Sequence, residues 1–303
     1  MKYSGIGGQA VIEGIMMMKG EDYAVAVRRP DKEIEVKKDT YQSITKKAKI
    51  LQLPFVRGVF RFADSMIIGM RSLTYSASFF EDDEDAEPGK FEQFLDRVFG
   101  EKLESAIMAA VLVISFILAI GIFMLLPLGI ANLFKGVITS DHLMAVLEGV
   151  IRIAIFIIYI KLVSRMEDIR RTFMYHGAEH KCINCVEHGH PLTVKYVRES
   201  SKEHKRCGTS FILIVMVISI LMFMVIRVDT IWMRILSRII LVPVIAGISY
   251  EVLQCAGRSN SKFMDLVSRP GMWMQGLTTK EPDDSMIEGA IAATVAVFDW
   301  REY

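Results

Sequence analysis

The sequence has 303 residues, and 52% of them are hydrophobic. Its 36 basic and 35 acidic residues leave a net charge of +1, which gives no sign of a nucleic-acid partner, and four cysteines are too few for a disulfide framework. The hydrophobic residues gather in a few long uncharged stretches, which is typical of an integral membrane protein. The N-terminus lacks an apolar core followed by a cleavage site, so no cleaved signal peptide is expected.

Residues 1–49 are expected to form a small cytoplasmic β unit. Within them, residues 23–38 (YAVAVRRPDKEIEVKK) alternate apolar and polar side chains on either side of a break at residues 29–32, which is typical of a β-hairpin. Residues 50–80 are apolar at helical spacing but punctuated by charged residues, which predicts an amphipathic helix on or partly in the inner leaflet of a membrane. Residues 81–90 (EDDEDAEPGK) predict an acidic linker.

Four long apolar stretches predict four transmembrane helices in a membrane domain of residues 91–255. The stretches are residues 106–134, 143–163, 209–226 and 235–253. The second contains Glu148 and Arg152, which are four residues apart with the acid first and are therefore expected to pair on one helix face.

Basic residues predict the orientation of these helices. The two connections expected outside the cell hold only Lys135 in one case and Arg227 and Arg234 in the other. The N-terminal region, the loop 164–208 and the tail 256–303 are rich in Lys and Arg, so both termini and this loop are expected in the cytoplasm. The predicted fold class is mainly α: a polytopic membrane protein with about four transmembrane helices, a small N-terminal β unit and an amphipathic interfacial helix.

The loop 164–208 concentrates potential metal ligands, with five of the six histidines and three of the four cysteines. His176, Glu179 and His180 match the H-x-x-E-H pattern, in which two imidazoles on one helix face hold a zinc ion beside a glutamate base. We therefore predict that His176 and His180 bind a divalent metal, with zinc expected, and that Glu179 is catalytic. A further ligand is required, and the sequence offers three candidates: His204, Cys207 and Glu251.

A metal is not the only interpretation of this loop. His176, Glu179 and His180 also fit a hydrogen-bonded network that ties the loop to the helix bundle. Cys182 and Cys185 form a C-x-x-C pair, but no second such pair and no thioredoxin-like pattern accompany it. An accessory or incidental role is therefore favoured for these two cysteines.

Four segments resemble the YqhQ-like family of bacterial membrane proteins of unknown function, whose members are often described as predicted metal-dependent enzymes. The segments are residues 7–18 (GGQAVIEGIMMM), 175–181 (YHGAEHK), 204–211 (HKRCGTSF) and 269–284 (RPGMWMQGLTTKEPDD). The resemblance covers essentially the whole chain in the same order and implies a multi-pass protein of the bacterial cell (inner) membrane. Carried over to this sequence, the family pattern marks Gln9, Glu13, Gly14, His176, Glu179, His180, Lys181, His204, Arg206, Cys207, Gly208, Gln275, Thr278, Thr279, Glu281, Pro282 and Asp283. Cys182 and Cys185 lie outside it, and Lys205 stands where the family usually has proline.

These observations predict a metal-dependent hydrolytic membrane enzyme with its site on the cytoplasmic face. Its metal ligands would be His176, His180, His204 and Cys207, and its substrate either a peptide segment of a membrane protein or a lipid-linked molecule. The alternative is a non-enzymatic scaffold or assembly factor, with residues 50–80 and 269–284 as contact surfaces for membrane-protein partners. A transporter is disfavoured because the sequence has no inverted repeat.

Overall fold

The computed structural model describes residues 3–80, 103–204, 206–226, 230–258, 261–301 and 303. The chain divides into two compact units, of which the first comprises residues 1–80 and 160–303 and the second comprises residues 81–159. The predicted acidic linker, residues 81–90, lies outside the described residues.

A four-stranded antiparallel sheet in the order β1-β2-β3-β4 is the centre of the first unit. Its strands are β1 (Ile6–Val11), β2 (Gly14–Lys19), β3 (Asp22–Arg28) and β4 (Ile34–Thr40). The predicted hairpin is confirmed as β3 and β4, paired from Asp22 opposite Thr40 to Arg28 opposite Ile34. The turn between β1 and β2 places Glu13 at a φ of 47°, a left-handed conformation that few residues other than glycine adopt.

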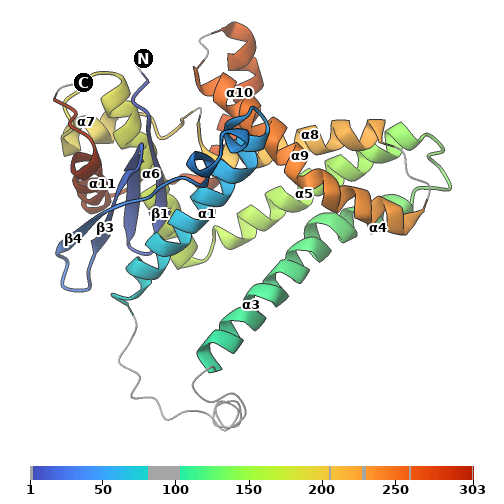
Figure 1. The fold of residues 1–303 in the computed structure, drawn as a ribbon, viewed down its shortest axis with the longest axis horizontal. Helices are drawn as coiled ribbons and strands as arrows, with labels where there is room; N and C mark the ends of the chain where they lie inside the picture. Colours follow the sequence, from blue (N-terminus) through green and yellow to red (C-terminus); the bar gives the residue numbers. More distant parts are fainter. Residues whose placement is uncertain (1–2, 81–102, 205, 227–229, 259–260, 302) are drawn as a thin grey trace. The chain divides into compact units, whose positions relative to one another are not determined.

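Both faces of this sheet are covered, as the uninterrupted apolar run of β2 requires. On one face, α6 (Glu167–Glu187) and α11 (Asp284–Val297) cover the sheet (Figure 1). The side chains of Ile15 and Met17 pack against these two helices. On the other face, Met16 and Val25 pack with Ile68 of α1 (Val56–Ala77). The N-terminal strands therefore share one core with a helix from the middle of the chain and a helix from its end.

The remaining elements of the first unit are mostly helical. They are the 3₁₀ turns η1 (Ile44–Lys47) and η2 (Lys49–Gln52), and the helices α7 (Val194–Glu199), α8 (Gly208–Val225), α9 (Ile231–Arg258) and α10 (Lys262–Thr278). Helix α8 packs against α9 and α10, and α1 packs against α9. Gly247 lets α9 approach α1 closely, because a Cβ there would lie 2.3 Å from the carbonyl oxygen of Phe55.

The second unit contains α3 (Leu103–Ile120), the π-helical turn η4 (Gly121–Leu125), α4 (Leu126–Asn132) and most of α5 (Asp141–Val163). The predicted pairing of Glu148 with Arg152 on α5 is confirmed, with a carboxylate oxygen 2.7 Å from a guanidinium nitrogen. Both side chains are buried. A buried ion pair needs such a close contact to offset the loss of hydration of its two charges.

Four helices among the described residues are long and apolar enough to cross a membrane: 110–132, 141–163, 208–225 and 235–257. Each coincides closely with one of the predicted apolar stretches. The predicted fold class, a mainly α chain with four such helices and a small N-terminal sheet, is therefore confirmed.

Candidate metal centre

Helix α6 carries the H-x-x-E-H motif, and its polar side chains hold the segment that follows it. Lys181 donates hydrogen bonds from Nζ to the carbonyl oxygens of residues 198 and 200, and Asn184 donates from Nδ2 to those of residues 201 and 203. These bonds fix the end of α7 (Val194–Glu199) and the connection that follows it along α6. They thereby position Cys207, which follows shortly after and is the N-cap of α8.

His176, His180 and Cys207 are the three metal-ligating side chains that converge among the described residues. The ligand atoms that they offer all lie within 4.8 Å of one another, and Sγ of Cys207 is 3.2 Å from Nε2 of His176. In tetrahedral zinc sites, bonds of 2.0–2.3 Å place neighbouring ligand atoms about 3.3–3.6 Å apart. The group therefore closes around one ion with side-chain shifts of about 1 Å.

The two imidazoles are oriented through their other ring nitrogens. His176 donates from Nδ1 to the carbonyl oxygen of Thr278 at 3.0 Å, and His180 donates from Nδ1 to that of Lys202 at 2.7 Å. A proton on each Nδ1 leaves the lone pair on Nε2, which is the tautomer that metal-binding histidines adopt with such partners. Sγ of Cys207 accepts a hydrogen bond from the backbone N–H of Thr209 at 3.4 Å.

Glu179 lies one position before His180 on α6 and is only 7% exposed. Burial raises the pKa of its carboxyl group above the ordinary value, and the opposing effects of the nearby His176 and of a hydrogen bond from the backbone N–H of Gly8 are smaller. Gly8 is required at this point of β1, because a Cβ there would lie 2.9 Å from Cγ of Glu179. The carboxylate is thus held between α6 and the sheet.

A cavity of about 590 Å³ opens beside this group. Its wall includes His176, Glu179, His180 and Cys207. Three protein ligands beside an open space are typical of a catalytic zinc site, whereas structural sites are closed by a fourth protein ligand.

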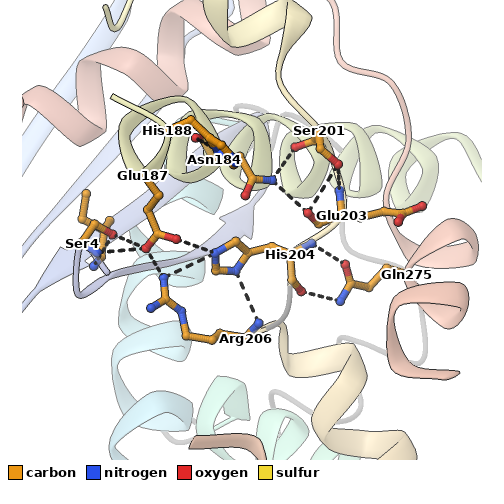
Figure 2. Close-up of polar contacts among 10 residues, drawn as sticks. Ser4, Asn184, Glu187, His188, Ser201, Glu203, His204, Arg206 and Gln275 are labelled. Atoms are coloured by element: carbon orange, nitrogen blue, oxygen red, sulfur yellow. Dashed lines mark hydrogen bonds and ion pairs between the residues drawn. The ribbon is translucent and has the colours of Figure 1, made fainter. Parts of the chain in front are cut away.

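His204, which the sequence also offers as a ligand, has partners outside the group. Its Nε2 donates to Glu187 at 3.4 Å, and its Nδ1 accepts from the backbone N–H of Arg206 (Figure 2). Glu187 also pairs with the Arg206 guanidinium and accepts from the backbone N–H and the hydroxyl of Ser4. Burial raises the pKa of Glu187, but the hydrogen bonds and the Arg206 charge outweigh it and lower the value to about 2.

The other candidate ligands lie apart from the group. Glu251 forms a two-pronged ion pair with Arg57 of α1, with contacts of 2.7 and 2.6 Å. Cys182 and Cys185 are fully buried in the core between α6, α11 and the sheet, where burial raises the pKa of both thiols. Both side chains pack there as small apolar core residues.

The C-terminal segment that carries several of the family-marked residues contacts His176 and His204. Gln275 is fully buried and clamps the backbone of His204, since its Oε1 accepts from the N–H and its Nε2 donates to the carbonyl. Gly177, an unfavourable residue for the middle of a helix, permits this segment to approach α6: a Cβ there would lie 2.0 Å from the carbonyl oxygen of Lys280.

Sequence reasoning missed Ser4 and Glu187, which build the network beside His204. One signal was present, because His180, Asn184 and Glu187 recur at positions i, i+4 and i+7 and so form a polar stripe on one face of α6. The carbonyl groups of residues 202 and 278 that orient the imidazoles carry no signal in the sequence.

Comparison with known proteins places the chain in a family. Residues 53–300 match the family described as a protein of unknown function, DUF1385. The chain is 34% identical over 286 residues to the uncharacterized protein YqhQ of Bacillus subtilis strain 168, and the match covers 94% of this chain and 89% of that protein. No solved structure matches. The chain therefore belongs to the YqhQ-like, DUF1385 family of proteins of unknown function.

Proposed function

We propose that this protein is a metal-dependent hydrolase of the bacterial cell (inner) membrane, with its active site at the cytoplasmic surface. The observation that carries the proposal is the convergence of His176, His180 and Cys207, with the Nδ1 atom of each imidazole bound to a backbone carbonyl. Two nitrogens and one sulfur suit zinc better than magnesium or calcium, which take oxygen ligands.

This location is supported by the position of Cys207, which directly precedes the candidate membrane helix 208–225. The proposed centre is thus next to one end of a candidate membrane span. The excess of Lys and Arg in the segments around α6 supports a cytoplasmic position for that end.

Bound zinc supplies a Lewis acid that polarises the scissile group and makes water easier to deprotonate. Glu179 accepts a proton from the attacking water as the new bond forms at the carbonyl or phosphoryl centre of the substrate. The bond to the leaving group breaks, and Glu179 returns the proton to that group. The cavity beside Glu179 is the space in which the scissile bond is held.

The scaffold alternative receives less support from the arrangement of the C-terminal segment. Gln275, Thr278 and Thr279 are buried, so these three residues of the segment 269–284 are not available as a docking surface, whereas Trp273 is 62% exposed. In a scaffold, Glu179 would have only a structural role.

The test compares Glu179→Gln with the wild type, using the full-length chain in detergent with one equivalent of zinc. The probes are p-nitrophenyl acyl esters and p-nitrophenyl phosphate. We expect zinc-dependent hydrolysis by the wild type, a loss of about 10²–10⁴-fold in Glu179→Gln, and unchanged zinc content. Glu199→Gln, which removes an exposed acid outside the cavity, is the matched control and is expected to retain activity. Equal hydrolysis by wild type and Glu179→Gln, or none by zinc-loaded wild type, would contradict the proposal.

A further inference from the structure

The cavity beside the metal group has one polar end and one apolar side. The polar end contains the metal group, Glu179 and two arginines, Arg61 of α1 and Arg206. The apolar side is formed by residues of three helices: Phe62 and Met66 of α1, Phe211 and Ile212 of α8, and Leu253 of α9. A cavity of this volume holds one small ligand, and its composition fits a molecule that is itself polar at one end and apolar at the other.

The apolar side lies where the candidate membrane helices end. Ile212 is in the first turns of the span 208–225, and it is 42% exposed. Met66 is 56% exposed on α1, and the nearby Phe62 contacts Phe211 with the ring centroids 5.7 Å apart and the rings tilted by 30°. Exposed apolar side chains at the end of a membrane span face lipid rather than water, so this side of the cavity adjoins the bilayer.

The polar end carries two guanidinium groups, those of Arg61 and Arg206. Arg61 is exposed and has no ion-pair partner in the described part of the chain. Arg206 pairs with Glu187 through one nitrogen, but its buried Nη1 has no hydrogen-bond partner among the described residues. Among the described residues that line the cavity, Glu179 is the only acidic one. Two guanidinium groups in such a place favour a phosphate, which accepts hydrogen bonds from both.

We propose that the substrate of this site is a lipid of the bilayer with a phosphate-bearing head group. The head lies between Arg61, Arg206 and the metal group, and the chain lies along Phe62, Met66 and Ile212. That this lipid is hydrolysed rests on the proposed function, whereas the binding of the lipid does not. A transmembrane peptide fits less well, because a helix 10–12 Å across would have to unwind before it entered a cavity of about 590 Å³.

The test is photolabelling of the full-length chain in phosphatidylcholine nanodiscs. The probes are a phosphatidic acid and a diacylglycerol that carry the same diazirine-bearing acyl chain, and mass spectrometry locates the labelled peptides. We expect phosphatidic acid to label α1 and the start of α8. Ile212→Trp should reduce this labelling about tenfold by filling the cavity. Leu221→Trp, which is exposed on the same helix but outside the cavity, should leave it unchanged.

The charged end is tested with a second pair of variants. Arg61→Gln should remove the preference for phosphatidic acid over diacylglycerol, whereas Arg71→Gln, on the same helix but against the ring of Tyr41, should keep it. The proposal would be overturned by equal labelling of Ile212→Trp and Leu221→Trp, or by the absence of a preference between the two probes. It would also be overturned if inorganic phosphate or a hydrophobic helical peptide displaced the probe as effectively as lipid does.

Metal content, measured on the same samples, separates this inference from the proposed function. Lipid labelling of the cavity in a chain that binds no metal would refute the hydrolase and leave the lipid site standing. A zinc-bound chain that hydrolyses probes but shows no cavity labelling would refute the lipid and leave the hydrolase standing.

Discussion

Gly177→Ala tests whether the close approach of α6 to the C-terminal segment maintains the metal centre. The new Cβ would lie 2.0 Å from the carbonyl oxygen of Lys280, so the segment must move by about 1 Å to restore an ordinary contact. That shift would break the 2.8 Å hydrogen bond from Lys280 N–H to Phe173 and lengthen the bond from His176 to Thr278.

The expected cost combines three effects. Overpacking of a tight contact costs about 1–3 kcal/mol, and the two weakened hydrogen bonds cost about 1 kcal/mol each. The greater helix propensity of alanine offsets about 1 kcal/mol of this. The free energy of unfolding should therefore fall by about 2–4 kcal/mol, and each kcal/mol lowers the Tm by roughly 2–4 °C. Zinc affinity should fall about 10–100-fold, because His176 loses its orienting partner.

The assay is thermal unfolding of the full-length chain in detergent, together with zinc titration. Gly276→Ala on α10 is the matched control, since nothing lies within 4 Å of a Cβ there and the same gain in propensity applies. A Gly177→Ala chain as stable as Gly276→Ala, with unchanged zinc affinity, would refute the reasoning.

Two further predictions concern the network around His204. Gln275→Met should lower the free energy of unfolding by about 2–4 kcal/mol in the same thermal assay, because the backbone N–H and carbonyl of His204 lose their partners; an unchanged Tm would contradict the clamp. Acid should destabilise the chain through Glu187, whose pKa is lowered to about 2 in the folded state. The contribution of Glu187 to the free energy of unfolding is complete above pH 4.5 and disappears as the pH falls toward 2. Glu187→Gln should therefore flatten the decline in Tm over this range. An identical decline in both proteins would rule this out.

The membrane helices and the β3–β4 hairpin could be predicted because their patterns are local. An uncharged run long enough to span a bilayer, or strict alternation around a turn, depends only on neighbouring residues. The packing of α11 against β2 and β3 joins residues more than 250 positions apart, and no local pattern specifies it.

The metal ligands, too, could be predicted only as far as local sequence spacing determines them. His176 and His180 could be paired from their spacing on one helix, but the further ligand could not be chosen among His204, Cys207 and Glu251. In the structure, Cys207 faces the imidazoles because it is the N-cap of α8. His204 forms a hydrogen bond with Glu187 instead, and Glu251 forms an ion pair with Arg57. Each outcome depends on a contact between distant segments that spacing alone does not determine.

The most direct test of the central claim is the metal content of the purified full-length chain, measured by elemental mass spectrometry. About one divalent ion per chain is expected in the wild type, and none in His176→Ala/His180→Ala or in Cys207→Ala. His188→Ala/His190→Ala and Cys185→Ala remove the same residue types outside the group and should keep the ion. A folded wild type that holds no metal even after zinc is added, or equal loss in the control variants, would contradict the assignment of this group as a metal centre.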